Sequence, residues 1–361
     1  MPGAVNSPWL FGRRTDLLLF GGSTAVALLF LGIGHATGLL DGDAPPWLFL
    51  VAVVGVDVAH VWSTGWRVLS DGHEVSRRLW LYAGVPVAAW CAGVAAYSVS
   101  PLFFWRVLAY LAVFHFIRQQ YGWVALYRRK NGEGQGGRFL DAAAIYGATL
   151  TPLLFWHAHL PRKFQWFLKG DFLSGLPEGV SRAAFVIYAG ILAAWIGKEL
   201  ARARAGRPLS WGKILIVFST ATTWHLGIVV FDSDYAFTVL NVFVHGIPYM
   251  GLVWFTSKAR AAARREAGEP PSLADRMAPR LVLFLAPLLL VAFAEEWGWD
   301  RLVWHDHAVI FPGPALDPGV MLLALIVPLL ALPQATHYVW DAFLWKVKPA
   351  NDATVLALGI R

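Results

Sequence analysis

Long apolar stretches separated by short polar loops dominate the pattern of this chain. A helix needs about 20 mostly apolar residues to cross a hydrocarbon layer of about 30 Å. Ten segments meet this requirement, at residues 17–40, 46–69, 79–99, 101–127, 139–160, 182–199, 210–231, 234–256, 279–297 and 318–346. The first is too long for the apolar core of a signal peptide, so we count it as a span. The pattern therefore predicts an all-α, polytopic helical membrane protein whose residues 1–361 form a single transmembrane domain.

The basic residues are distributed unequally over the predicted loops. With the N-terminus placed in the cytoplasm, 23 Lys and Arg residues lie on the cytoplasmic side and five on the opposite side, while Arg106 and Arg118 fall within a span. Such an excess on one side is what the positive-inside rule describes. We therefore expect both termini in the cytoplasm and a bacterial-type inner membrane as the location. The net charge of +7 then reflects orientation, and we expect no nucleic-acid partner.

Composition narrows the classes of protein and of site further. Apolar residues make up 57% of the chain and charged residues 15%, against about 25% charged residues in soluble domains. This excludes an ordinary soluble domain. The single cysteine, Cys91, lies in an apolar run, which excludes a disulfide framework and iron–sulfur chemistry.

Four histidines lie at similar depth in four different predicted spans. They are His60, His115, His245 and His337. Counted from the cytoplasmic end of each span, all four lie at roughly 13–18 Å, close to the middle of the bilayer. Ionisable groups at this depth are costly and usually functional. We therefore expect the four imidazoles to converge on one centre and to bind a metal ion.

Two aspartates and one arginine accompany these histidines. Asp57 precedes His60 by three residues and Asp341 follows His337 by four, so each pair shares a helix face. Each aspartate is either a further metal ligand or a hydrogen-bond acceptor that orients the imidazole. Arg118 needs a counter-charge, which one of the aspartates or an anionic substrate headgroup could supply. We take Asp57, Arg118 and Asp341 as candidate catalytic residues.

Two amides and two loops complete the polar features. Asn241 lies four residues before His245 and Gln119 four residues after His115, so each amide is expected to orient its histidine. The loop at 132–137 is rich in glycine, but no strand precedes it, so a phosphate-binding loop is not favoured. The outer loop at 161–181 is interpreted as an interfacial helix or a docking surface.

Neutral imidazoles and carboxylates are ligands of first-row transition metals. We expect a metal within the bilayer to act on a lipophilic substrate. We favour a non-haem iron oxygenase that takes its substrate from the surrounding lipid and its electrons from a redox partner. Two alternatives remain open. One is a proton-coupled transporter that uses a relay of aspartates, histidines and Arg118. The other is a haem-binding electron carrier with two of the histidines as axial ligands.

The architecture also resembles a known family. Together with the segment FVHGIPY at 243–249, where a span histidine is followed by glycine and an aromatic residue, it resembles the membrane-embedded bacterial β-carotene dioxygenases of the bacteriorhodopsin-related protein type. The resemblance implies iron bound by the four span histidines, the set that depth also indicates. Asp57, Arg118 and Asp341 are not expected from that family. The HxxxH and HxxHH boxes of membrane desaturases and hydroxylases do not occur in the chain.

Overall fold

The computed structural model describes residues 7–42, 44–345 and 357–360, and every regular element within these ranges is a helix. Ten helices are long and apolar enough to cross a membrane. They are Arg13–Thr37, Pro46–Leu69, Trp80–Val99, Pro101–Lys130, Arg138–His159, Glu178–Arg204, Trp211–Val230, Asp234–Glu266, Leu281–Trp304 and Gly319–Leu344. Each corresponds to one predicted span, which confirms the all-helical class and the ten candidate membrane-spanning helices. The basic residues Lys346, Lys348 and Arg361 of the charge count lie outside the described residues.

Several spans are composed of α-helical and π-helical segments in succession. In chain order the elements are α1 (Arg13–Asp16), η1 (Leu17–Gly22), α2 (Ser23–Thr37), α3 (Pro46–Leu48), η2 (Phe49–Val58), α4 (Ala59–Leu69), α5 (Gly72–Arg77), η3 (Trp80–Gly84), α6 (Val85–Val99), α7 (Pro101–Lys130), α8 (Arg138–His159), α9 (Glu178–Arg204), α10 (Trp211–Trp224), η4 (His225–Val230), α11 (Asp234–Phe237), η5 (Thr238–Val242), α12 (Phe243–Glu266), α13 (Leu273–Met277), α14 (Leu281–Trp299), η6 (Asp300–Trp304), α15 (Gly319–Leu330) and α16 (Leu332–Leu344). Here η denotes a π-helix.

The ninth span is longer than predicted. We expected it to end at residue 297, but α14 continues through η6 to Trp304. Glu295 and Glu296, which stand near the predicted end, are therefore followed by about two further turns of helix, and both are half-buried. Glu295 Oε2 accepts a hydrogen bond of 2.6 Å from Trp62 Nε1. This indole partner explains how a carboxylate is accommodated at a position where hydropathy predicts the end of the helix.

Contacts between Cα atoms divide the chain into two compact units. The first unit comprises Met1–Asp43, Ala112–Pro248 and Ala357–Arg361, and the second comprises Ala44–Leu111 and Tyr249–Leu356. Two of the boundaries, at residues 111/112 and 248/249, fall within α7 and α12. Whether residues 1–361 fold as a single domain stays a prediction.

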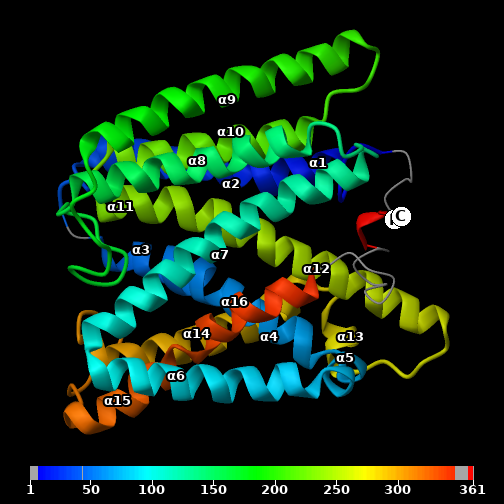
Figure 1. Ribbon diagram of the computed structural model, residues 1–361. Helices are drawn as coiled ribbons and strands as arrows, with labels where there is room; N and C mark the ends of the chain where they lie inside the picture. Colours follow the sequence, from blue (N-terminus) through cyan, green and yellow to red (C-terminus); the bar gives the residue numbers. More distant parts are fainter. Residues whose placement is uncertain (1–6, 43, 346–356, 361) are drawn as a thin grey trace. The chain divides into compact units, whose positions relative to one another are not determined.

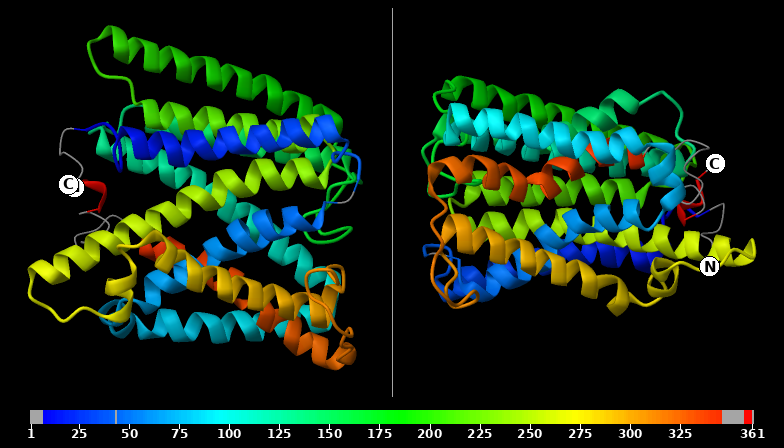
Figure 2. Two further views of the ribbon diagram at one scale, coloured as in Figure 1. Left: turned by 180° about the vertical axis from the view of Figure 1, so that it is seen from behind. Right: turned by 90° about the horizontal axis from the view of Figure 1, so that it is seen from below.

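In the first unit, α8 packs along both α9 and α10, and the three helices run side by side (Figures 1 and 2). The approach of α8 to α9 depends on Gly147. A Cβ atom at this position would lie 2.3 Å from Cδ2 and 2.7 Å from Cε2 of Tyr188, a ring that is buried against it. Glycine is therefore required by the packing of these two helices.

We predict that Gly147→Ala destabilises the protein, by about 1–3 kcal/mol, because the added methyl group forces the Tyr188 ring or the helix axis to move. The measurement is thermal unfolding in detergent followed by far-UV circular dichroism. Gly190→Ala on α9 is the matched control, since nothing lies within 4 Å of its Cβ position. It should leave the unfolding temperature unchanged or raise it slightly, because alanine favours a helix. Equal behaviour of the two variants would contradict the close approach.

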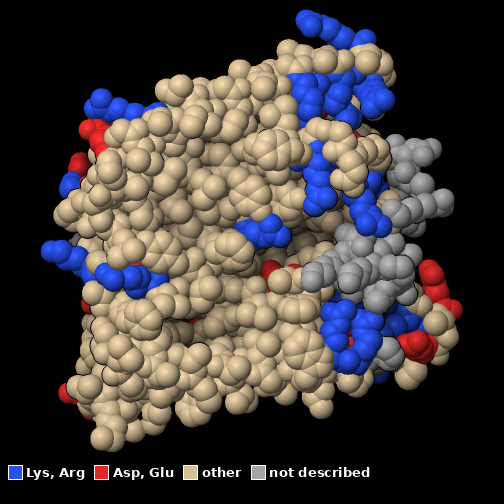
Figure 3. Space-filling model, in the orientation of Figure 1, with Lys and Arg blue, Asp and Glu red and all other residues tan. Residues whose placement is uncertain are grey.

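A cluster of buried charged side chains lies at one end of the first unit. Lys213 is fully buried and its Nζ lies 2.8 Å from Glu133 Oε2, 2.8 Å from Glu199 Oε1 and 3.2 Å from Asp141 Oδ1. Further cations complete this buried ion cluster, which we define as Arg128, Glu133, Asp141, Lys198, Glu199, Arg202 and Lys213. Figure 3 shows Lys and Arg side chains gathered at this end of the unit, where α9 finishes.

The ion cluster also explains the glycine-rich loop at 132–137. Gly132 and Gly137 have φ values of 60° and 82°, which favour glycine, and between them the chain turns so that Glu133 faces the cations. The carboxylate of Glu133 therefore occupies the position beside Lys213 that an anion would need. The loop is held by a buried ion pair, and a phosphate-binding interpretation is not required.

In the second unit, α4 packs against both α14 and α16, and α6 packs against α15 and α16. An apolar core lies along α14 and includes Val54, Val58, Tyr249, Phe284 and Leu288. Since His60 lies on α4 and His337 on α16, the contact between these two helices brings both histidines to the inside of the unit.

Two of the π-helical segments directly precede span histidines. η2 ends at Val58, two residues before His60, and η5 ends at Val242, three residues before His245. A π-helix has more residues per turn than an α-helix, so every residue after it is rotated relative to a regular helix. Such segments are frequent at functional sites, and here they set the direction in which the two histidine side chains point.

Candidate metal centre

The second unit contributes the histidine pair His60 and His337. Both side chains are buried, with 2% and 1% of their surface exposed. Their ring centroids lie 5.0 Å apart and the rings are nearly perpendicular, at 79°. The edge of Tyr249 contacts both imidazoles, with centroid distances of 5.8 Å to His60 and 5.2 Å to His337. The two histidines therefore share one small, aromatic-walled space.

Asp57 and Asp341 lie beside these rings, as their helical spacing predicts. Each has a carboxylate oxygen 3.6 Å from the Nδ1 atom of its histidine. This distance is longer than a hydrogen bond. The closer partner of His337 Nδ1 is the hydroxyl of Thr64, whose Oγ1 lies 2.7 Å away. Asp341 therefore reaches its histidine through Thr64, not directly as we predicted.

Four side chains form a continuous hydrogen-bond chain behind His337. Tyr249 donates its hydroxyl proton to Asp341 Oδ1 over 2.5 Å, and Trp345 Nε1 donates to the Tyr249 oxygen over 3.1 Å. Thr64 Oγ1 lies 2.5 Å from the Tyr249 hydroxyl oxygen and donates to Asp341 Oδ1 at 3.2 Å. We call this set, Thr64, Tyr249, Asp341 and Trp345, the carboxylate chain.

The hydroxyl of Thr64 is placed to orient the imidazole of His337. When its proton is directed to Tyr249 or Asp341, Oγ1 accepts the hydrogen bond from His337 Nδ1. In this arrangement Nε2 carries the lone pair that a metal would need, and we take it as the basis of the proposal below. Thr64 and Tyr249 were not predicted, although each lies four residues after a span histidine and so on the same helix face.

The first unit contributes the pair His115 and His245, which are also buried. Their ring centroids lie 5.3 Å apart at an angle of 83°. The ring of Phe116 is stacked on His245 with a centroid distance of 3.7 Å and an angle of 6°, which restricts the rotation of this imidazole. Gln119 Nε2 donates to the backbone carbonyl of His245 over 2.8 Å, in place of the predicted contact with His115.

Asn241 does not take the predicted position beside His245. Its Nδ2 atom donates to the carbonyl of Phe237 in the preceding turn, over 3.2 Å. Asn241 belongs to η5, whereas His245 belongs to α12, so the interval of four residues crosses the change from π to α geometry. The spacing rule holds for a regular α-helix and is unreliable across such a junction.

The four predicted ligands occur as two buried pairs, His60 with His337 in the second unit and His115 with His245 in the first. Each imidazole offers one ligand nitrogen. All four residues are buried. Neutral imidazole nitrogens are ligands of zinc, copper, iron and nickel, so the group is of the right type to hold a transition metal.

Arg118 is exposed on α7, and its guanidinium donates a hydrogen bond to the hydroxyl of Tyr146 on α8. It also lies over the ring of Tyr121, 5.1 Å from the centroid. Among the described residues Arg118 takes part in no ion pair, so the predicted aspartate counter-ion is replaced by two tyrosines. Its role in catalysis stays a prediction.

Three other histidines inside or near spans, His157, His159 and His225, bond to their own helices. Nδ1 of His225 lies 2.8 Å from the carbonyl of Ala221, and Nδ1 of His157 lies 2.7 Å from that of Leu153. Each of these bonds gives one ring nitrogen of the histidine a partner in the preceding turn of the same helix. They agree with the interpretation of such histidines as structural hydrogen-bonding groups.

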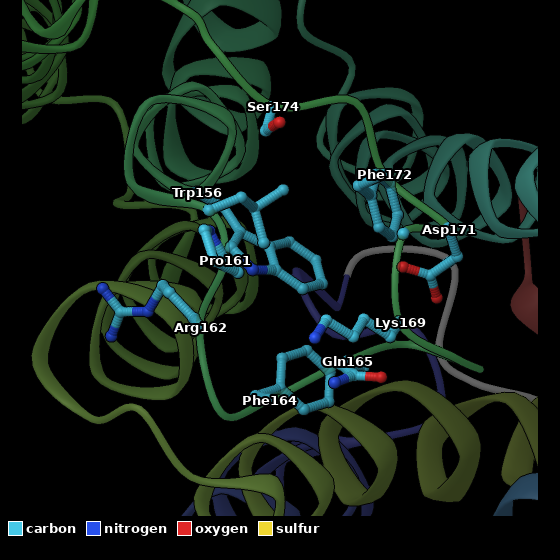
Figure 4. Close-up of a pocket in the computed structure, with 11 residues that line it drawn as sticks. Trp156, Pro161, Arg162, Phe164, Gln165, Lys169, Asp171, Phe172 and Ser174 are labelled. Carbon is cyan, nitrogen blue, oxygen red and sulfur yellow. The ribbon is translucent and has the colours of Figure 1, made fainter.

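A separate hollow of about 240 Å³ lies in the first unit, within the outer loop that we predicted to be a docking surface or an interfacial helix (Figure 4). Trp156, Phe164 and Phe172 form its aromatic wall. Asp171 is buried, which raises its pKa, and it accepts hydrogen bonds from the backbone amides of residues 167 and 168. Residues 161–177 form no helix and residues 178–181 are the start of α9, so the predicted interfacial helix is wrong.

Comparison with known proteins adds no family to this description. No protein-family profile, no curated protein and no solved structure matches the chain. The function must therefore be argued from the residues of the site.

Proposed function

We propose that the chain is a membrane-embedded metalloenzyme in which His60, His115, His245 and His337 hold one metal ion. The observations that carry this proposal are the equal depth of the four histidines in their predicted spans and their burial as two close pairs, with ring centroids 5.0 Å and 5.3 Å apart. Ionisable groups at this depth in a span are costly and usually functional.

Charge balance supports a divalent ion at this position. Four neutral imidazoles leave the charge of the ion uncompensated, which is costly in a medium of low dielectric constant. Two carboxylates, Asp57 and Asp341, lie 3.6 Å from the Nδ1 atoms of His60 and His337. Their two negative charges match those of a divalent cation. Each aspartate thus has a role without being a ligand.

Non-haem iron is the ion we favour, since when bound it would supply oxidation of C–H or C=C bonds with dioxygen. The surroundings favour a lipophilic substrate, because the protein consists of ten apolar helices and the histidines lie within four of them. We propose a bacterial inner membrane as the location, with both termini in the cytoplasm and an external redox partner that supplies electrons. The excess of basic residues on one side of the spans supports this orientation.

The test is metal analysis of the purified protein together with its absorption spectrum. We expect stoichiometric iron without a Soret band. A Soret band would instead establish the haem carrier. A folded protein that neither contains nor binds a first-row metal would overturn the proposal, and proton-coupled transport would then be tested in vesicles.

We predict that Thr64→Val lowers the metal affinity by about 10–100-fold, since the variant removes the acceptor that holds the proton of His337 on Nδ1. The measurement is a titration of the metal-free protein with Co²⁺ against a competing chelator. In the same metal-free protein, ¹⁵N NMR of His337 should change from the Nδ1–H form to a mixture of tautomers.

Thr64→Ser is the matched control because it keeps the hydroxyl. It should bind Co²⁺ within a few-fold of the wild-type affinity and retain the Nδ1–H form. If Thr64→Val also retained that form, the carboxylate chain would have no part in orienting His337.

A further inference from the structure

An exposed polar patch lies on α7 and α8 of the first unit, outside the histidine pair of that unit. It consists of Arg118, Tyr121, Arg138 and Tyr146, which we call the arginine–tyrosine patch. Arg118 donates to the hydroxyl of Tyr146, and Arg138 Nη2 lies 3.5 Å from the hydroxyl of Tyr121. The two tyrosine rings are stacked, with a centroid distance of 5.3 Å and an angle of 20°.

The patch contains hydrogen-bond donors but no carboxylate that could accept from them. Both tyrosine oxygens accept from an arginine, so each phenolic proton remains available for a further partner. Neither arginine takes part in an ion pair among the described residues. Arg118 and Arg138 are exposed and the two tyrosines are half-buried, and each arginine donates a hydrogen bond to one of these tyrosines. A donor-rich group of this kind is complementary to an anion with several oxygens.

The depth of the patch limits where the anion can come from. Tyr146 lies eight residues after the start of α8, about 12 Å along the helix, and Arg118 lies twelve residues before the end of α7, about 18 Å along it. Arg138, by contrast, is the first residue of α8. The patch therefore leads from the end of the helices to a point inside the apolar layer, where a soluble anion would not be stable.

Apolar side chains continue the patch in the direction away from Arg138. Phe114 precedes Arg118 by one helical turn and Leu150 follows Tyr146 by one turn, and they are 62% and 42% exposed. Such a surface fits a molecule with an anionic head and an apolar chain. In a bilayer the abundant molecule of this kind is an anionic phospholipid.

We infer that the arginine–tyrosine patch is a binding site for one anionic phospholipid, whose phosphate lies between Arg118 and the two tyrosine hydroxyls and whose acyl chain follows Phe114 and Leu150. This site is independent of the proposed metal centre, because neither its residues nor its ligand belong to the histidine group.

The test is native mass spectrometry of the full-length protein in a neutral detergent, with equal additions of dioleoylphosphatidylglycerol and dioleoylphosphatidylcholine. The wild type should retain the anionic lipid in preference, and Arg118→Gln should weaken that retention about tenfold, as expected for loss of a charge-assisted hydrogen bond. Tyr146→Phe should weaken it less, since the charge remains.

Two controls keep the result interpretable. Arg118→Lys retains the charge and should retain part of the preference even if Arg118→Gln proved unstable. Arg14→Gln removes an exposed arginine from another part of the first unit and should change nothing. The inference is overturned if the wild type retains both lipids equally, or if Arg118→Gln retains the anionic lipid as the wild type does. It is also overturned if Arg118→Gln dissociates an oligomer while lipid retention stays the same, because the patch would then contact a second copy.

Discussion

Alanine at His245 or at His337 should abolish metal binding. Each variant removes one of the four proposed ligands, all of which are buried. Loss of an outer hydrogen-bond partner already costs about 10–100-fold in metal affinity, and loss of a ligand should cost more. We expect the bound metal to fall below about a tenth of the wild-type amount in both variants, measured by elemental analysis after purification in a metal-buffered medium.

The choice of these two histidines makes the experiment informative about the whole group. His245 belongs to the first unit and His337 to the second. If each histidine pair held its own metal, either variant would lose only half of the metal, and the proposed single centre would be wrong. His225→Ala is the control, because that ring bonds to the carbonyl of Ala221 in its own helix. It should retain the full metal content.

Replacement of Lys213 by methionine should give the largest loss of stability among single substitutions of charged residues in the first unit. The lysine is fully buried between Glu133, Asp141 and Glu199. Removal of one partner from a buried ion pair typically costs about 3–5 kcal/mol, because the remaining charges stay buried without compensation. Thermal unfolding in detergent should therefore begin at a markedly lower temperature.

An exposed ion pair in the same unit provides the comparison. Arg182 Nη2 lies 2.6 Å from Glu178 Oε1, but their side chains are 75% and 54% exposed. Pairs of this kind contribute about 1 kcal/mol or less, so Arg182→Gln should change the unfolding temperature little. If Lys213→Met and Arg182→Gln behaved alike, the buried ion cluster would not be a stabilising element.

The architecture was largely predictable. A helix that crosses a membrane satisfies its backbone polar groups internally and presents apolar side chains, so each span is visible in the sequence as a continuous apolar run. Ten predicted spans correspond to ten helices. The errors lie at the ends, where this rule gives no information. The ninth span was predicted to end at residue 297, yet the helix continues to Trp304, and Glu295 near the predicted end has the indole of Trp62 as a partner.

The four histidines of the candidate site were predicted from depth, but their hydrogen-bond partners were not predictable. Depth along the spans selects His60, His115, His245 and His337, and the structure buries all four. The partners of those histidines follow from the rotation of each helix, which the π-helical segments η2 and η5 alter. As a result Asn241 and Gln119 bond to backbone carbonyls, and Thr64 stands between His337 and Asp341.

The sequence by itself determined that this is a multi-pass helical protein, and it selected four histidines at one level. Both conclusions depend only on length, hydropathy and position along a helix. The tertiary structure decided which way each side chain faces. It turned Arg118 outward onto Tyr146, and it linked Asp341 to His337 through Thr64 and Tyr249. These contacts depend on the rotation and packing of helices far apart in the chain, for which a linear pattern contains no information.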